Sequence, residues 1–270
     1  MKKFLVVLLV SVAVAAQSQD HGHINIGSTG VNQSDPLIFD NAAIFEVATN
    51  YVKTLSLATS GNYAGYYQGN ITFTALAATP AHAGPVANAA ALGSRIHVQL
   101  VAVDGPAGGI FSFWNTGATT PTISLTSGGT GTNTWIVSEN DGSPGSDPYG
   151  HFHGRRFTAT KPGVYTVSFR ALDFSTNGTG GGSIHVPSQV MQVYFQAGVN
   201  IRHIEPDVDH THVTFSAPIG KMWVVEASDS VATNAVWTTI SAGVLGDDYF
   251  HVITDDEPVA ENRFYRMRGF

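Results

Sequence analysis

The sequence contains no cysteine. Disulfide bonds, a lipid-modified cysteine anchor and thiolate metal ligands are therefore all excluded. Only 12% of the residues are charged, and acidic residues outnumber basic ones, which gives a net charge of -7. Such a surface tends to repel the phosphates of nucleic acids. Beyond the first residues, no apolar run approaches the roughly 20 residues of a membrane-spanning helix, so we expect no membrane span.

The N-terminus has the layout of a secretory signal peptide. Lys2 and Lys3 are followed by an apolar stretch from Phe4 to Ala16 and then by the polar residues Gln17 and Ser18. That stretch is shorter than a membrane-spanning helix and ends in small residues, as a cleavage site requires. We therefore expect residues 1–18 to be a signal peptide and the mature protein to be secreted, either extracellular or periplasmic.

The mature region predicts β-strands, because short apolar runs alternate with polar residues between glycines and few windows have helical spacing. In the segment from Ser94 to Asp104, every second residue from Ile96 to Ala102 is apolar. Residues two apart share one face of a strand, so this face is expected to be buried. Further strands are expected at Thr122–Leu125, Thr134–Ser138, Gly163–Arg170 and Gln189–Gln196. The pattern predicts an all-β fold, an antiparallel β-sandwich of Ig-like or jelly-roll-like type.

A composition change near residue 202 predicts a second unit. The polar run Arg202 to Asp209 is typical of a boundary, and shorter strands are expected after it, near Val213–Ser216, Met222–Ala227 and Phe264–Met267. We therefore expect a main β-sandwich domain over residues 19–201 and a small C-terminal β module over residues 202–270.

Six of the eleven histidines form three His-x-His pairs, whereas random placement predicts about 0.4 pairs. In a strand, both members of such a pair project from one face, where neutral imidazoles bind metal ions. We predict that His21, His23, His151 and His153 form one metal site. Zn2+ is the expected ion, with Cu2+ and Ni2+ as alternatives, because all three suit imidazole ligands.

The third pair, His210 and His212, lies in the polar run at the expected boundary, where a solvated linker would look similar. His97 and His185 fall in expected strands and could complete a site, whereas isolated histidines are weak indicators of function. The exposed-strand interpretation, in which paired histidines are ordinary polar residues, remains open for all three pairs.

Aromatic residues offer a further alternative, a carbohydrate-binding face. Trp114 and Trp135, with Tyr63, Tyr66 and Tyr67, could line such a surface, although aromatic rings in a sandwich more often belong to the core. Nothing in their spacing shows that the rings point outward together.

Several segments resemble a family of bacterial surface-anchored repeat domains that is associated with metal-transporter loci and with zinc-regulated secreted proteins. The similar segments are His21–Gly27, Val101–Pro106, Ile110–Trp114, Gly150–Thr158 and Lys161–Tyr165. The resemblance covers roughly residues 20–198 and implies secretion, a β-sandwich and a connection to zinc, with no known reaction. The remainder resembles a small β module that is appended to many secreted bacterial proteins.

No specific signature of an enzyme is present. The sequence has no His-Glu-x-x-His helix, no Gly-x-Ser-x-Gly elbow and no phosphate-binding loop. Glu139, Asn140, Asp141 and Asp147 offer oxygen ligands, but they lack the regular alternation of a helical-type calcium loop. We therefore expect a non-catalytic, secreted or cell-surface metal-binding protein that supports metal acquisition, with cell-surface components or a metal transporter as partners. The alternative is a structural or adhesive surface protein without metal.

Overall fold

The computed structural model describes residues 22–76, 87–151, 156–257 and 262–270. Within these residues the chain consists mainly of strands, with one short helix, α1 (Ala42–Phe45), and two 3-10 turns, η1 (Val47–Thr49) and η3 (Thr179–Gly181). The expected all-β class is confirmed. The expected signal peptide, residues 1–18, lies outside the described residues, and none of the described helices is long and apolar enough to cross a membrane.

In the described part of the chain before residue 198 there are thirteen strands. They are β1 (His23–Ser28), β2 (Leu37–Phe39), β3 (Val52–Leu57), β4 (Tyr67–Gly69), β5 (Thr72–Ala75), β6 (Ile96–Asp104), β7 (Ile110–Trp114), β8 (Ile123–Thr126), β9 (Thr134–Ile136), β10 (Gly150–His151), β11 (Arg156–Ala159), β12 (Gly163–Asp173) and β13 (Met191–Ala197). They form a four-stranded sheet, in the order β10-β5-β1-β2, and a nine-stranded sheet, in the order β8-β7-β11-β4-β3-β13-β12-β6-β9. The strands expected around residues 96, 123, 134, 163 and 191 are all present.

The nine-stranded sheet is barrel-like and nearly closed. Backbone hydrogen bonds join the segment after β8 to β6, for example from the Gly128 amide to the Val103 carbonyl and from the Gly131 amide to the Val101 carbonyl. The sheet is mixed, because β13 runs parallel to β3. In the smaller sheet β1 likewise runs parallel to β5. Most of the other strand pairs are antiparallel, as expected, but these two parallel pairs join strands distant in the sequence and make both sheets mixed.

The burial pattern of β6 changes phase in its middle. Ile96, Val98 and Leu100 are buried as expected, but Ala102 is partly exposed and Val103 is buried instead. The register explains the change, because Leu100 pairs with Phe169 whereas Ala102 pairs with Ser168, which leaves Val101 without a partner residue on β12. One extra residue in a strand reverses the faces that follow it.

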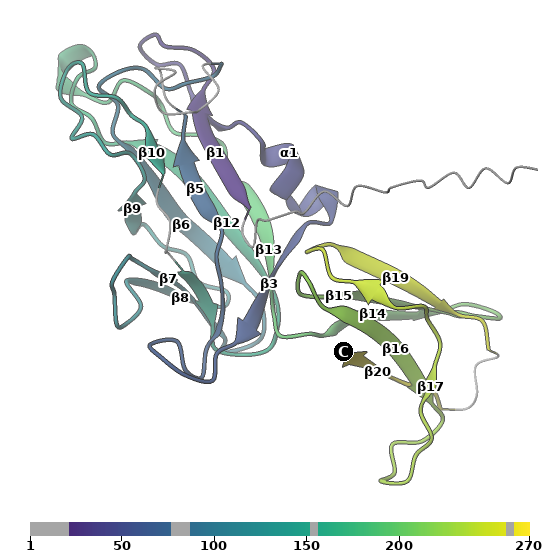
Figure 1. Ribbon diagram of the computed structural model, residues 1–270. Helices are drawn as coiled ribbons and strands as arrows, with labels where there is room; N and C mark the ends of the chain where they lie inside the picture. The colour runs from purple at the N-terminus through teal and green to yellow at the C-terminus, as the bar shows by residue number, and fades with distance from the viewer. Residues whose placement is uncertain (1–21, 77–86, 152–155, 258–261) are drawn as a thin grey trace, which may run out of the picture.

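The two sheets of the main unit enclose an aromatic core. Phe73 of β5 lies with its ring centroid 5.6 Å from Trp135 and 5.1 Å from Phe169, and Trp135 stacks on Phe113 at 4.2 Å. Figure 1 shows β1, β5 and β10 lying over β6 and β12. The smaller sheet therefore forms one layer over the inner face of the larger sheet, with the rings between them.

After residue 200, the described residues form seven strands. They are β14 (Ile201–Pro206), β15 (Thr211–Ser216), β16 (Met222–Ser228), β17 (Thr238–Thr239), β18 (Val244–Leu245), β19 (Phe250–Asp255) and β20 (Phe264–Gly269). They form one sheet in the order β14-β15-β19 and another in which β16 pairs with β17, β18 and β20. A smaller buried cluster, Val213, Phe215, Ala217 and Val225, lies within them. The polar run Arg202 to Asp209 is thus mostly strand β14, and the interpretation as a solvated linker is wrong.

A buried ion pair joins the strands of the main unit to those of the C-terminal unit. Lys53 Nζ lies 2.7 Å from Asp248 Oδ2, and both side chains are about 95% buried, with 6% and 4% of their surface exposed. The other oxygen of Asp248 accepts a hydrogen bond from the Thr54 amide, and Tyr51 packs edge-on against Tyr249. The independent folding of residues 202–270 stays a prediction.

Candidate functional site

The two histidine-bearing segments of the predicted metal site lie on opposite sides of one strand. β1 runs parallel to β5, with His23 in register with Thr72, and β10 runs antiparallel to β5, with His151 in register with Thr74. Figure 1 shows β10, β5 and β1 in this order. Neighbouring strands are about 4.8 Å apart, so the backbones of β1 and β10 are separated by about 10 Å. The fold therefore brings together two segments that are far apart in the sequence.

His23 is half-buried at the start of β1. Its Nδ1 atom lies 3.3 Å from the hydroxyl of Thr74, the same residue that is in register with His151. Asn41 fixes the local backbone, because its amide donates to the His23 carbonyl and its side-chain oxygen accepts from the Asn25 amide. The position of the His23 ring is thus set by β5 and by Asn41.

The threonines of β5 are site residues that our sequence analysis did not single out. Thr72 and Thr74 are both buried, and the hydroxyl of Thr72 has no hydrogen-bond partner within the described part of the chain. Because residues in register in neighbouring strands share a face, both threonines lie on the face that carries His23. The alternation Thr72-Phe-Thr74 was the signal that could have indicated them.

The other members of the predicted site fall outside the described part of the chain. His21 and His153 lie outside the described residues, and so does the side chain of His151. Among the residues that are described, no three His, Asp or Glu side chains are arranged to hold a metal ion. The four-histidine site, and with it the choice of Zn2+, Cu2+ or Ni2+, stays a prediction.

His185 is a structural residue rather than a ligand. Its ring is buried, Nδ1 lies 2.8 Å from the Asp35 carbonyl, and Nε2 accepts a hydrogen bond from the Ala91 amide. This ring therefore has its proton on Nδ1, and both nitrogens are used. It lies outside the strands, in the segment between β12 and β13, contrary to our expectation.

His97 lies in β6, as expected, and contacts its neighbours in the sheet rather than another histidine. Nδ1 lies 3.1 Å from the Thr134 hydroxyl, and the ring packs against Phe174. Burial, assisted by the charge of Arg95, lowers the pKa of His97 to about 4. The ring is therefore neutral near pH 7, and this neutrality has a structural cause.

The aromatic residues that could line a sugar-binding face are largely covered. Trp114 and Trp135 are 1% and 5% exposed. Tyr63 and Tyr66 pack edge-on against Trp114, whose Nε1 donates to the Thr158 hydroxyl. The two tryptophans therefore belong to the core and cannot serve as an exposed stacking platform.

In the acidic loop before β10, residues 139–147, polar side chains form hydrogen bonds within the loop itself. Hydrogen bonds from Ser143, assisted by Ser146, lower the pKa of Asp141 to about 2. The side chain of Asn140 donates to the Asp147 carbonyl. These contacts are those of a self-bonded surface turn, and they direct the Asp141 oxygens to serines rather than to a shared ion.

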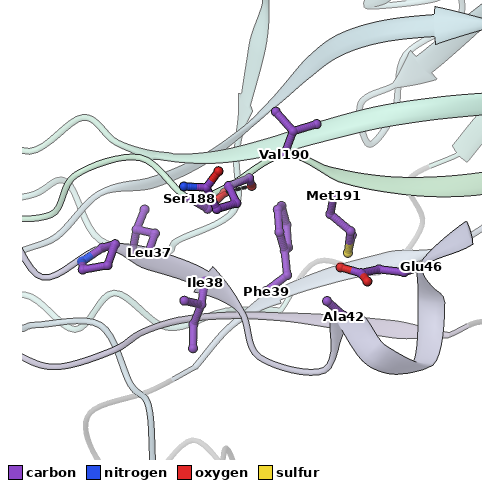
Figure 2. Close-up of a pocket in the computed structure, with 10 residues that line it drawn as sticks. Leu37, Ile38, Phe39, Ala42, Glu46, Ser188, Val190 and Met191 are labelled. Carbon is purple, nitrogen blue, oxygen red and sulfur yellow. Dashed lines mark hydrogen bonds between the residues drawn. The ribbon is translucent and has the colours of Figure 1, made fainter. Parts of the chain in front are cut away.

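An apolar pocket of about 260 Å³ lies between β2 and the start of β13. Figure 2 shows the ring of Phe39 pointing across this pocket toward Val190 and Met191, with the carboxylate of Glu46 at one end. Its lining contains a single carboxylate and no histidine or lysine. This pocket lacks the paired acid and base, or nucleophile and base, that catalysis requires.

Comparison with protein-family models, with curated proteins and with solved structures found no match to this chain. Its function is therefore argued from the residues and their geometry.

Proposed function

We propose that this protein is a secreted or cell-surface, non-catalytic protein that binds a divalent metal ion, Zn2+ above all, on the outer face of the sheet β10-β5-β1. His21, His23, His151 and His153 are the proposed ligands. The observation that supports this proposal is the position of Thr74, which is in register with His151 and in contact with the ring of His23. Two His-x-His segments about 130 residues apart thus flank one strand, with His23 in register with Thr72 and His151 with Thr74.

The chemistry of the segments fits zinc. Neutral imidazoles bind Zn2+ at about 2.0–2.1 Å in tetrahedral sites, and four histidines would complete such a site without thiolates. Two imidazoles that reach inward from β1 and β10 can span a backbone separation of about 10 Å with an ion between them. Because His23 lies on β1 and His151 on β10, the ion would also tie the two edges of β5 together.

The finer fold class and the biological setting belong to the same proposal. The layer of β10-β5-β1-β2 over the larger sheet supports a sandwich of Ig-like or jelly-roll-like type. The motif resemblance to surface-anchored repeat domains supports a role in metal acquisition with cell-surface components or a metal transporter. A structural or adhesive role without metal is the second candidate, and the closed aromatic core favours it over a carbohydrate-binding module.

The test is metal binding by the mature protein. Equilibrium dialysis against ZnCl2 at about pH 7.5, followed by elemental analysis, measures the stoichiometry. We expect the combined substitution His23→Ala and His151→Ala to remove one zinc ion per chain or weaken its binding at least tenfold. The matched control is His251→Ala, on β19 of the C-terminal unit, which should leave this ion in place. Unchanged binding in the double variant would refute the proposed site and favour the structural role.

A further inference from the structure

The third His-x-His pair lies on a built surface of the C-terminal unit. β14 and β15 form a hairpin that closes with the Asp207 amide donating to the His210 carbonyl at 2.8 Å. Glu205 is in register with His212. Residues in register share a face, and the alternate residues Thr211, Val213 and Phe215 are buried. The outer face of the hairpin therefore places the carboxylate of Glu205 opposite the imidazole of His212.

The two imidazoles of this pair meet at the distance of metal ligands. The Nε2 atoms of His210 and His212 are 3.1 Å apart, and the ring centroids are 4.6 Å apart. Two nitrogens bound at about 2.0–2.1 Å to one tetrahedral ion are separated by about 3.3 Å. An ion can therefore replace the shared proton between the two nitrogens with a small adjustment of the rings.

The outward-facing ring nitrogens have the partners that metal-bound histidines use. Nδ1 of His210 lies 2.7 Å from Asp209 Oδ1, and Nδ1 of His212 lies 3.2 Å from the Thr254 hydroxyl. Partners of this kind fix the ring orientation and the tautomer, and a carboxylate partner makes the ligand nitrogen more basic. The hydrogen bond to Asp209 correspondingly raises the pKa of His210.

Carboxylates stand next to the pair. Asp207 Oδ2 lies 3.6 Å from Nε2 of His210, close to the separation of two ligands of one ion. Its side chain is 57% exposed and can turn toward the pair, and water can fill the remaining position. Zn2+, Ni2+ and Cu2+ all accept two imidazoles with oxygen ligands.

We propose that His210 and His212 form a second metal site, for a divalent transition-metal ion, on the outer face of the hairpin β14–β15; the exposed side chain of Asp207 would turn to supply an oxygen ligand, and water would complete the site. The site differs from the one under Proposed function in every residue, so each can exist without the other. In the metal-free protein the Nε2 atoms of the two rings share a hydrogen bond.

The experiment uses the mature protein carrying His23→Ala and His151→Ala, so that only the second site is measured. Calorimetric titration with ZnCl2 and with NiCl2 at about pH 7.5 should show one ion per chain. His212→Ala should abolish binding or weaken it at least tenfold, and Asp209→Asn, which keeps both ligands, should weaken it by about 10–100-fold. The matched control is His203→Ala, on the same hairpin and 62% exposed, which should bind as the parent does.

A spectroscopic readout distinguishes ligation from loose surface binding. With one equivalent of Cu2+, electron paramagnetic resonance should show coupling to two nitrogens in the parent and to one in His212→Ala. Equal affinities in the parent and in His212→Ala, or equal losses in His203→Ala and His212→Ala, would overturn the proposal. The side chains of His203, Asp209 and His212 are partly or fully exposed, so circular dichroism should show that their variants are folded.

Discussion

The main unit and the C-terminal unit are stabilised by different interactions. The main core contains stacked and edge-on rings, among them Phe113, Trp135, Phe157 and Phe169, all buried. Among the described residues, the buried cluster of the C-terminal unit has four members, Val213, Phe215, Ala217 and Val225. Around it, however, lie ion pairs that are shielded from solvent. A small unit buries a smaller fraction of its apolar surface, so we expect the removal of one partner of a buried ion pair to be among its most destabilising changes.

Two carboxylates organise the charges of the C-terminal unit. Asp255, whose side chain is 2% exposed, accepts hydrogen bonds from Arg263 and Tyr265, and Arg263 also reaches Asp229. Elsewhere Glu226 lies between Arg266 and Arg268 at 2.8 and 2.7 Å. We therefore expect the main unit to lose most stability when a buried aromatic residue is truncated. The C-terminal unit should lose most stability when a buried acidic residue is neutralised.

The largest expected effect comes from the aromatic core. Phe157 is 1% exposed and contacts the rings of Phe111, Phe169 and Phe195. Phe157→Ala should lower the free energy of unfolding by about 3–5 kcal/mol, because it leaves a cavity. Urea denaturation monitored by tryptophan fluorescence measures the change. The control Phe174→Ala removes a ring that is 50% exposed and should cost about 1 kcal/mol or less.

Neutralising a buried acid should damage the C-terminal unit next most strongly. Asp255→Asn leaves Arg263 without its buried partner, and breaking such a pair costs about 3–5 kcal/mol. We expect the lower end, since Asp229 and Glu257 still contact Arg263. Asp229→Asn is the matched control, because Asp229 is 67% exposed and should contribute less than about 1 kcal/mol. Similar losses in both variants would contradict the role of burial.

The ion pair between the units should couple their stabilities. Lys53→Met, Asp248→Asn and the double variant form a thermodynamic cycle, and we expect a coupling free energy of about 1–3 kcal/mol. Asn suits position 248, where φ is 63°, because it tolerates the left-handed conformation. Calorimetry of the single variants should show two separated transitions. A coupling free energy of zero would mean that the two units do not depend on this contact.

The smallest expected effect is on the pH dependence of stability, which should differ between the two units. Because the pKa of His97 is lowered to about 4, the unfolded chain binds a proton that the folded chain does not between about pH 6.5 and 4. The stability of the main unit should therefore fall as pH falls through this window, and His97→Gln should remove that dependence.

The acids of the C-terminal unit act in a lower pH range. Hydrogen bonds from Arg268 and then Arg266 lower the pKa of Glu226, and hydrogen bonds from Arg263 lower that of Asp255 although burial opposes it. Folded pKa values below the unfolded ones mean stability that is present above about pH 4 and is lost as pH falls further. Thermal unfolding from pH 7 to 3 measures both windows, and loss of both units in one window would contradict the comparison.

The sequence predicts individual strands better than their partners. Local alternation locates β6, β12 and β13, because the apolar face of a strand is visible within a few residues. The closure of the nine-stranded sheet is not visible, because it depends on pairs such as β3 with β13. The sequence of β6 also does not predict the bulge at Val101, because the bulge is determined by the pairing of β6 with residues on β12.

The candidate sites, too, are predicted from the sequence in their local features but not in their contacts with distant residues. In the third pair, His212 lies on β15 and His210 directly precedes this strand, and the two rings meet with their Nε2 atoms 3.1 Å apart. It does not reveal that Thr74 stands between His23 and His151, or that Asp209 and Thr254 support the third pair. Those partners come from other strands or from the hairpin turn, and only the tertiary structure brings them close.

The parallel pairing of β3 with β13 also sets the order in which the chain can fold. β3 pairs only with β4 and β13 in the larger sheet, and β13 follows it by more than a hundred residues. Non-local pairs of this kind fold slowly, because loop closure precedes the gain from contacts. During synthesis one edge of β3 therefore stays unpaired until β13 has been made. An unpaired apolar edge at that stage favours association with other chains.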